Sequence, residues 1–518
     1  MVPDVFPLPG VVHGNRVVAT IIETRAKAGA NTQPWVSVPI DDNDISAGYR
    51  DVSFQQLNNA ANHAARWLSQ ALPATSEPFQ YFAYAGPKDL RYPCLAVAAA
   101  KLQKVMVLPS PLLTPGAQLR VQEKTNCKLY LRPSEMAGPA SNILRNAPHV
   151  EQITASGIEE FFRDDEADPM VYSKTWDEGK EDPWLVFHTS GTTGHPKPVT
   201  YSQQMMATPN TAASLPDFKP SQIHQSAQAR YYTPLPALHF IGMFVTLGLT
   251  TGHHTTCVVG PPIPPNPKLL INIIRYRKVA GVLLNPVLID ALCLSPEGLQ
   301  ALCVLKFVHY ISASLFAKSG NMISPYTNLT CGNVSFQRDI GAEFHHRMKG
   351  IHELVFVRWP EFRLQPIFQL YPNLQTFETN DLFIEHPEHK GLWKIIGRKD
   401  DYVYLVHGDG IHAALLEEEI VAHPSVKAAV IGGFGRPVPV LLVELVPAAE
   451  ADDVDALKRS LEPYIEKANV HCHDVVKLSS ERLIVAKKEK PFVTTLKGNA
   501  LRLQTLELYE EEIPALFE

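Results

Sequence analysis

The sequence has few cysteines, no long apolar run and no excess of basic charge, and each shortage argues against a class of protein. It contains 7 cysteines among 518 residues. That number is odd and no Cys-x-x-Cys spacing occurs, which argues against a disulfide framework and a zinc ribbon. The most apolar stretches, near residues 92–108 and 238–251, are too short or too polar for a transmembrane helix. We therefore expect no membrane partner.

The first residues show no basic segment followed by an apolar one, so we expect no secretory leader. Scattered thiols are typical of a reducing compartment, which predicts a cytoplasmic location. Lys and Arg total 47 against 53 Asp and Glu, a formal net charge of −6. This balance argues against a protein whose whole surface binds nucleic acid, so no nucleic-acid partner is expected.

Proline is plentiful, with 43 residues against 29 glycines. The prolines are scattered singly or in short clusters, which indicates a loop-rich globular chain. Apolar residues at helical spacing predict a helix over 54–72, followed by a strand at 79–85, a helix at 93–104 and a strand at 105–109. This alternation favours a mostly parallel sheet with helices on its faces.

The texture changes near residue 394. Beyond it, short strands surround a charged GRKDD segment, and helices and strands then mix within about 120 residues. We place a boundary near Ile396. The predicted fold class is α/β: a large N-terminal domain, 1–396, with mixed or parallel sheets flanked by helices, and a small mobile α+β domain, 397–518.

One run carries most of the chemical information: VFHTSGTTGHPKPVT, residues 186–200. Glycines let a backbone approach an anion closely, hydroxyls and N–H groups donate to it, and a lysine adds positive charge. The alternative, a plain surface loop, does not explain so restrictive an order of residues, and a Walker A loop is excluded because Gly-Lys-Ser/Thr is missing. The predicted polyphosphate-binding residues are Thr189, Ser190, Gly191, Thr192, Thr193, Gly194 and Lys197.

TSGTTGHPKP closely resembles the phosphate loop of the adenylate-forming superfamily, which includes acyl-CoA synthetases, nonribosomal peptide synthetase adenylation domains and luciferases. Four further motifs follow in the order seen in that superfamily. TPLPALHFIGMF places His239 at the acyl pocket, TNDL places Asp381 at the ribose hydroxyls, and GRKDD supplies Arg398 for the ribose and Asp400 as the domain hinge. KPFVTTLKGNALR carries Lys497 as the catalytic lysine. The resemblance covers essentially the whole chain.

By this resemblance the protein activates a carboxylic acid with ATP and Mg²⁺, and Lys497 bridges the carboxylate and the α-phosphate. Relatives often have Gly-Lys where this chain has Lys497-Gly498, and the lysines nearby leave a solvated face as the alternative. His239 is open between a packed core histidine and a wall of the acyl pocket. Leu283, Leu284 and Asn285 are further candidates for that wall.

SFQQLNNAANHAARWL, GPKDLRYPCLAVAAAKL and LWKIIGRKDDYVYLVHGDGIH resemble the adenylation domains of fungal nonribosomal-peptide-synthetase-like adenylate-forming reductases. The implied acyl acceptor is a phosphopantetheine carrier domain or CoA, neither of which lies in this chain. Amino-acid-activating relatives usually have an Asp in the segment around His239, and none occurs here. The predicted substrate is therefore an aryl or other non-amino carboxylic acid.

The chain departs from the superfamily between residues 327 and 350. Relatives carry a Tyr-Gly-Ser/Thr-Thr-Glu block there, whose Glu ligates Mg²⁺, whereas this sequence reads TNLTCGNVSFQRDIGAEFHHRMKG. No metal ligand can be assigned. The missing block leaves open a catalytically impaired homologue that binds nucleotide or acyl ligand without turnover. A free-standing acyl-CoA ligase is a second alternative to a carrier-dependent adenylation domain.

Overall fold

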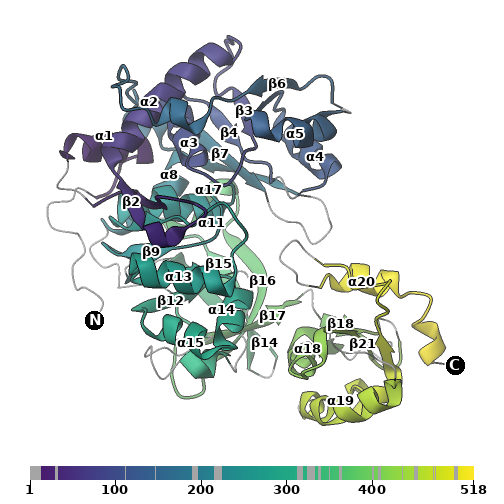
Figure 1. Ribbon diagram of the computed structural model, residues 1–518. Helices are drawn as coiled ribbons and strands as arrows, with labels where there is room; N and C mark the ends of the chain where they lie inside the picture. Colours follow the sequence, from purple (N-terminus) through teal and green to yellow (C-terminus); the bar gives the residue numbers. More distant parts are fainter. Residues whose placement is uncertain are drawn as a thin grey trace. The chain divides into compact units, whose positions relative to one another are not determined.

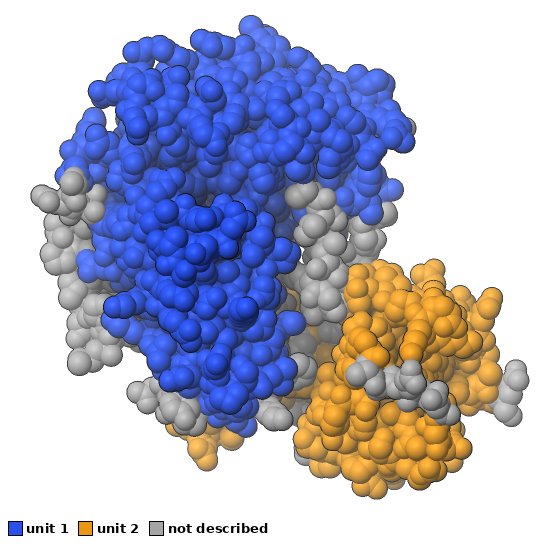
Figure 2. All heavy atoms as spheres, viewed as in Figure 1, with its two compact units in different colours: residues 1–332, 336–341, 358–375 blue, residues 333–335, 342–357, 376–518 orange. Residues whose placement is uncertain are grey.

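The computed structural model forms two compact units (Figure 2). Unit 1 comprises residues 1–332, 336–341 and 358–375, and unit 2 comprises 333–335, 342–357 and 376–518. Unit 2 includes strands that precede residue 396, and the predicted boundary near Ile396 stays a prediction. The structure describes residues 13–29, 33–110, 113–145, 147–188, 196–214, 225–311, 315, 319–323, 333–336, 340–348, 350–360, 364–399, 402–405, 410–434, 436–447, 453–470, 472, 474–494 and 500–517.

The first sheet of unit 1 has six strands, all parallel except the last (Figure 1). Apolar side chains on one face pack against α2 and α3, and those on the other face pack against α4 and α5. The strand order is β6 (Glu151–Thr154), β5 (Leu129–Arg132), β3 (Tyr81–Tyr84), β4 (Val105–Val107), β7 (Pro183–His188) and β8 (Pro198–Ser202). The helices are α1 (Val18–Lys27), α2 (Phe54–Ala71), α3 (Arg91–Lys101), α4 (Pro115–Thr125), α5 (Ala137–Leu144), α6 (Ile158–Phe161) and α7 (Trp176–Gly179). The predicted strand–helix–strand alternation over 79–109 is confirmed.

The second sheet also has six strands, and only β2 runs antiparallel to its neighbour. The strand order is β12 (Phe307–Tyr310), β11 (Gly281–Leu284), β9 (Arg230–Tyr232), β10 (Thr256–Val258), β1 (Val36–Pro39) and β2 (Tyr49–Val52). Its helices are α13 (Pro267–Arg277), α14 (Pro286–Cys293) and α15 (Pro296–Cys303). Shorter helices of unit 1 are α8 (Gln203–Met206), α9 (Thr208–Ala212), α11 (Phe240–Met243), α12 (Thr250–Gly252) and α17 (Pro366–Leu370).

The plentiful prolines have a structural use in this unit. Helices α13, α14 and α15 each open with a proline directly after an Asn or Ser whose side chain accepts a backbone N–H of the first turn. A proline has no N–H to leave unsatisfied at the first helical position, and its fixed φ suits that position. These prolines therefore start helices rather than interrupt them.

Unit 2 combines an antiparallel sheet with a small α+β module. The sheet order is β13 (Asn333–Val334), β17 (Trp393–Arg398), β16 (Thr376–Glu385), β15 (Ile351–Val357) and β14 (Ala342–Met348). The module contains the hairpin β18 (Tyr402–Tyr404) and β19 (Gly410–His412), the sheet β20 (Val426–Gly432), β21 (Val440–Leu445) and β22 (Leu483–Val485), and the helices α18 (Ala413–Val421), α19 (Val454–Asn469) and α20 (Arg502–Leu508). The predicted α+β character of the C-terminal segment is confirmed. Within the described ranges of both units, no helix is long and apolar enough to cross a membrane.

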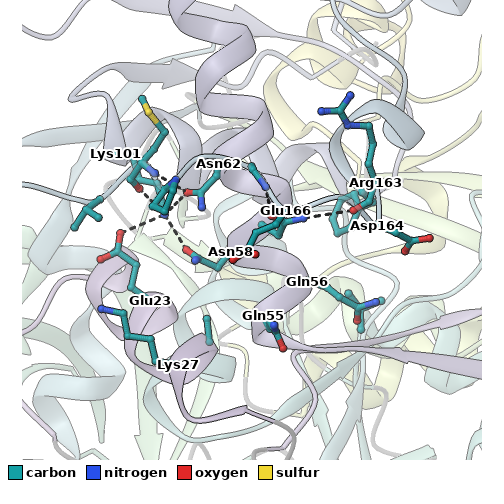
Figure 3. A pocket seen from close by; sticks show the side chains of 18 of the residues that line it. Glu23, Lys27, Gln55, Gln56, Asn58, Asn62, Lys101, Arg163, Asp164 and Glu166 are labelled. Atoms are coloured by element: carbon teal, nitrogen blue, oxygen red, sulfur yellow. Dashed lines mark hydrogen bonds and ion pairs between the residues drawn. The ribbon is translucent and has the colours of Figure 1, made fainter.

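A buried lysine joins three helices of unit 1 (Figure 3). Lys101, at the end of α3, has a side chain that is 1% exposed, and its Nζ lies 3.2 Å from a carboxylate oxygen of Glu23 on α1. The same Nζ donates to Oδ1 of Asn58 and of Asn62 on α2, and to the carbonyl of Met170, each at 2.8 Å. Burial lowers the pKa of Lys101, and Glu23 opposes that shift. A cleft of about 740 Å³ lies beside this cluster, between α1, α2 and residues 162–171.

We predict that Lys101→Met destabilises the protein by about 3–5 kcal/mol, because it removes the cation beside the largely buried Glu23 carboxylate and the shared donor of the Asn58, Asn62 and Met170 oxygens. Urea denaturation measures this change. The matched control is Lys180→Met, which breaks the exposed pair with Asp177 and should cost no more than about 1 kcal/mol. Equal losses in the two variants would contradict the prediction.

Candidate functional site

The predicted site residues fall into two groups. Thr189, Ser190, Gly191, Thr192, Thr193, Gly194, Asp400 and Lys497 lie outside the described residues. Lys197, His239, Asp381 and Arg398 are described, the first two in unit 1 and the last two in unit 2.

The segment predicted to bind phosphates connects β7 and β8, which are antiparallel neighbours. His188 ends β7 and pairs in register with Pro198, the first residue of β8. The backbone N–H of Ser110, just beyond β4, donates to Nε2 of His188 at 3.1 Å. Lys197 is exposed directly before β8. The two ends of the segment are thus fixed at the carboxyl edge of a mainly parallel sheet, where such folds place their ligands.

In unit 2, Asp381 and Arg398 are direct partners across β16 and β17. A bulge positions the aspartate, because β16 has Thr379, Asn380 and Asp381 where β15 has only Leu354 between paired residues. Asn380 adopts a left-handed φ of 61°. The Thr379 hydroxyl donates to the Leu354 carbonyl at 2.8 Å and accepts the Asp381 N–H at 3.0 Å. The strand pairing therefore brings together the two residues that the sequence predicts at a ribose.

A buried carboxylate lies beside this pair. Glu353 on β15 is fully buried, accepts from Nε of Arg347 at 2.7 Å and lies 3.3 Å from Nζ of Lys399. Burial raises the pKa of the Glu353 carboxyl, but the hydrogen bonds and charges of Arg347 and Lys399 outweigh it and hold the pKa below its ordinary value. Lys399 directly precedes Asp400, the predicted hinge.

A cavity of about 200 Å³ lies between the second sheet of unit 1 and the chain segment that follows His239. The sheet contributes Tyr231, Leu283 and His309 to its lining, and the helical segment contributes Ile241, Phe244, Val245 and Leu249. The other described lining residues are Ser226, Tyr310 and Ile311, and none of the described lining residues is charged. Two segments that the sequence places at an acyl pocket thus line one cavity.

The helical wall of this cavity contains a π-helical stretch, Phe244–Leu249, between α11 and α12. Two side chains from the start of the chain donate to carbonyls in and just after this stretch: Trp35 Nε1 to Thr246 O at 2.8 Å, and Arg25 Nη1 to Thr250 O at 2.5 Å. A π-helical turn widens a helix and often occurs at functional sites. Buried donors therefore hold this irregular wall in position.

The loop that precedes α11 packs closely against that helix at Gly242. A Cβ on Gly242 would lie 2.1 Å from the carbonyl oxygen of Pro236, so only glycine fits there. His239 is half-buried, immediately precedes α11 and is not among the described residues that line the cavity. Its predicted role at the acyl pocket stays a prediction.

Of the three further candidates for the pocket wall, Leu283 lines the cavity. Leu284 lies in the separate hydrophobic cluster around α13 to α15, because successive side chains of a strand point to opposite faces. The Asn285 side chain caps α14 by accepting the N–H of Leu288 at 3.0 Å. Neither Leu284 nor Asn285 therefore lines this cavity.

Tyr231 and His309 were not predicted to belong to the site. The Tyr231 hydroxyl lies 2.9 Å from His309 Nδ1, and His309 Nε2 lies 3.0 Å from Gln225 Oε1. Burial lowers the pKa of His309 to about 4, so the imidazole is neutral at pH 7. The signal available in the sequence was a histidine inside the apolar strand FVHY.

Within the described ranges, no group of three or more His, Cys, Asp or Glu side chains could hold a metal ion. Much of the segment 327–350, where relatives carry their Mg²⁺ ligand, lies outside those ranges.

Comparison with known proteins matches both parts of the chain to families of AMP-binding enzymes. Residues 28–353 match the AMP-binding enzyme family, and residues 400–518 match the AMP-binding enzyme C-terminal domain. The chain is 27% identical over 539 aligned positions to a carboxylic acid reductase of Neurospora crassa, covering 98% of this chain and 51% of that protein. It is 26% identical to the isocyanide synthase-NRPS hybrid crmA of Aspergillus fumigatus, covering 98% of this chain and 34% of that protein. The chain thus spans about half of the first relative and a third of the second.

Solved structures show the same fold at low sequence identity. The anthranilate CoA ligase AuaEII in complex with anthranoyl-AMP superposes with a TM-score of 0.70 at 15% identity, over 97% of this chain and 99% of that chain. The acetoacetyl-CoA synthetase from Streptomyces lividans gives a TM-score of 0.72 at 15% identity, over 98% of this chain and 90% of that one. The predicted fold class is therefore confirmed.

We predict that Asn380→Val destabilises unit 2 by about 1–2 kcal/mol, because a β-branched residue is strained at a left-handed φ. Asn380→Gly is the matched control and should be nearly neutral, since glycine adopts this conformation freely. Urea denaturation followed by fluorescence compares the two variants. If valine and glycine were equivalent at this position, the bulge would not constrain it.

We also predict that the protein loses stability on acidification, in part through His309. Its pKa is lower in the folded protein, about 4, than the ordinary value of about 6.5, so the unfolded chain binds more protons between these values. The contribution is complete above about pH 6.5 and falls by at most about 1.4 kcal/mol per pH unit toward pH 4. Urea midpoints at several pH values, compared with those of His309→Phe, test this. Parallel pH profiles for the two proteins would contradict it.

Proposed function

The chain belongs to the AMP-binding enzyme family, and we propose that it uses ATP to activate an aryl or other non-amino carboxylic acid as its acyl-adenylate. In this reaction the carboxylate attacks the α-phosphate of ATP, and pyrophosphate leaves. The protein's task is to position two anions that repel each other and to neutralise the charge that develops between them.

The observation that carries the choice of acid is the uncharged cavity beneath the π-helical segment. An α-ammonium group buried there would find no carboxylate among the described lining residues, and an unpaired buried charge is costly. At about 200 Å³ the cavity is smaller than the roughly 300–1,000 Å³ common for ligand pockets. A small apolar acyl group, such as one aromatic ring, suits this size.

The remaining roles follow from the predicted residues. Asp381 accepts from the ribose hydroxyls, because a carboxylate can accept from both, and Arg398 binds beside it. Thr189, Ser190, Gly191, Thr192, Thr193 and Gly194 bind the β- and γ-phosphates together with Lys197. Lys497 bridges the acid and the α-phosphate, and Asp400 is the hinge between the two half-reactions.

Mg²⁺ suits this reaction, because it neutralises the phosphates and is usually held by only one or two carboxylates plus phosphate oxygens. Its requirement is part of the proposal, and no ligand is assigned. The second half-reaction passes the acyl group to a thiol, either a phosphopantetheine carrier or CoA. We place this chemistry in the cytoplasm.

Pyrophosphate exchange with a panel of aryl, keto and fatty acids tests the proposal. We expect exchange with small aryl acids, dependent on Mg²⁺, and a loss of roughly 10²–10³-fold in Lys497→Ala with ATP binding retained. The matched control is Lys487→Ala, an exposed lysine of the same segment that should retain full activity.

Unchanged exchange in Lys497→Ala would remove the role of that lysine. Thioester formation with added CoA would identify a free-standing ligase. Nucleotide binding without exchange for any acid would favour the impaired homologue, which the missing Tyr-Gly-Thr-Thr-Glu block makes the second candidate. Efficient exchange would exclude that candidate.

A further inference from the structure

We propose that the acyl cavity selects acids whose ring carries a hydrogen-bond donor, a hydroxyl or an amine, and that the Tyr231 oxygen is the acceptor that recognises it. This inference rests on the proposed function, since it specifies the acid bound in the same cavity. It depends on the direction of two buried hydrogen bonds.

The first step fixes the proton on His309. Gln225 presents Oε1 to Nε2 of the imidazole at 3.0 Å. An amide oxygen can only accept, so Nε2 carries the hydrogen. The imidazole is neutral because burial lowers its pKa to about 4, and a neutral ring has only one N–H. His309 Nδ1 is therefore an acceptor.

The second step fixes the proton on Tyr231. Its hydroxyl lies 2.9 Å from Nδ1 of His309, and because Nδ1 can only accept, the tyrosine donates. Burial also raises the pKa of Tyr231, so the phenol keeps its proton. With its hydrogen committed, the phenol oxygen can only accept a further hydrogen bond. Gln225 and His309 thus convert a hydroxyl that could donate or accept into an acceptor.

The third step concerns the position of this residue pair at the cavity. Tyr231 on β9 and His309 on β12 both line the cavity, so the hydrogen bond between them runs along its wall. Phe307 packs against both rings, with centroids 5.5 Å from Tyr231 and 4.9 Å from His309. Gly281 permits this packing, because a Cβ there would lie 2.0 Å from the Phe307 ring. The aromatic cluster therefore fixes the Tyr231 ring.

The helical wall gives the ligand no competing polar side chain, and the other described hydroxyls of the lining belong to Ser226 and Tyr310. The described residues opposite the sheet are apolar and come from the helical segment that contains the π-helical stretch. The Ser226 hydroxyl and carbonyl both accept from Thr255 Oγ1, at 3.5 Å and 2.8 Å. A planar ring packed between these walls would direct a donor substituent toward Tyr231.

Matched acids test the selection. We compare 4-hydroxybenzoate and 3-hydroxybenzoate with their methoxy analogues and with benzoate, using pyrophosphate exchange for kcat/KM and calorimetry for binding to the intact chain. The methoxy group retains an oxygen but cannot donate. We expect at least one hydroxy acid to exceed its methoxy analogue by about tenfold or more, because a site built to bind a hydroxyl discriminates against ligands that lack it.

Two variants separate recognition from packing. Tyr231→Phe removes only the acceptor oxygen, and should abolish the hydroxy preference while benzoate is still bound. Tyr232→Phe is the matched control: Tyr232 is the next residue of β9, packs in the cluster on the opposite face and should retain the preference. His309→Phe frees the Tyr231 hydrogen to donate, and should shift the preference toward the methoxy acids. Thermal melts verify that each variant is folded.

The outcomes distinguish the two proposals. Exchange with benzoate but equal values for hydroxy and methoxy acids overturns the inference and leaves the proposed function standing, and so does a hydroxy preference that survives in Tyr231→Phe. If no acid supports exchange, calorimetry decides: a hydroxy preference in binding supports the inference without turnover. Exchange with keto or fatty acids alone overturns the inference and leaves the proposed function standing, and absence of binding by every acid of the panel overturns both.

Discussion

The helical wall of the cavity in unit 1 depends on two buried hydrogen-bond donors from the start of the chain. The indole N–H of Trp35 and the guanidinium of Arg25 bind carbonyls of Thr246 and Thr250, in and just after the π-helical stretch. Arg25 also packs 3.8 Å over the ring of Phe54 on α2. A wider, irregular helical turn is costly in isolation, because its carbonyls lack the usual geometry. The surrounding fold stabilises it, and the cavity forms beneath it.

In unit 2 the irregular backbone is a β-bulge in strand β16. The bulge in β16 inserts residues opposite Leu354, and Asn380 accepts a left-handed backbone conformation that most side chains avoid. The result is a half-buried Asp381 directly opposite Arg398. Beside the pair, Glu353 is buried but charged, because Arg347 and Lys399 both contact it. Irregular backbone and buried charge thus concentrate where the nucleotide is proposed to bind.

The cavity that we propose for the acyl group differs from this region of unit 2, because no charged side chain is among its described lining residues. Its polar groups bind one another in a chain from Gln225 through His309 to Tyr231, and its described lining carries no charge. We propose that such a lining discriminates by hydrogen-bond direction and shape rather than by ion pairing, which suits a small neutral ring. The nucleotide site and the acyl site that we propose differ in this respect, which agrees with a reaction in which only the carboxylate end of the acid meets charge.

The sequence by itself determined the family and the α/β fold, and it singled out Asp381 and Arg398 as candidates, because motifs such as TNDL and GRKDD are short and local. Only the tertiary structure decided which side chains line the cavity that we propose for the acyl group. Leu284 and Asn285 neighbour Leu283 in sequence, yet strand alternation and helix capping turn them away from the cavity. Tyr231 and His309 lie 78 residues apart and meet because β9 and β12 flank β11 in one parallel sheet. Strand order is set by packing across the whole unit, so a local sequence pattern cannot predict which strands become neighbours.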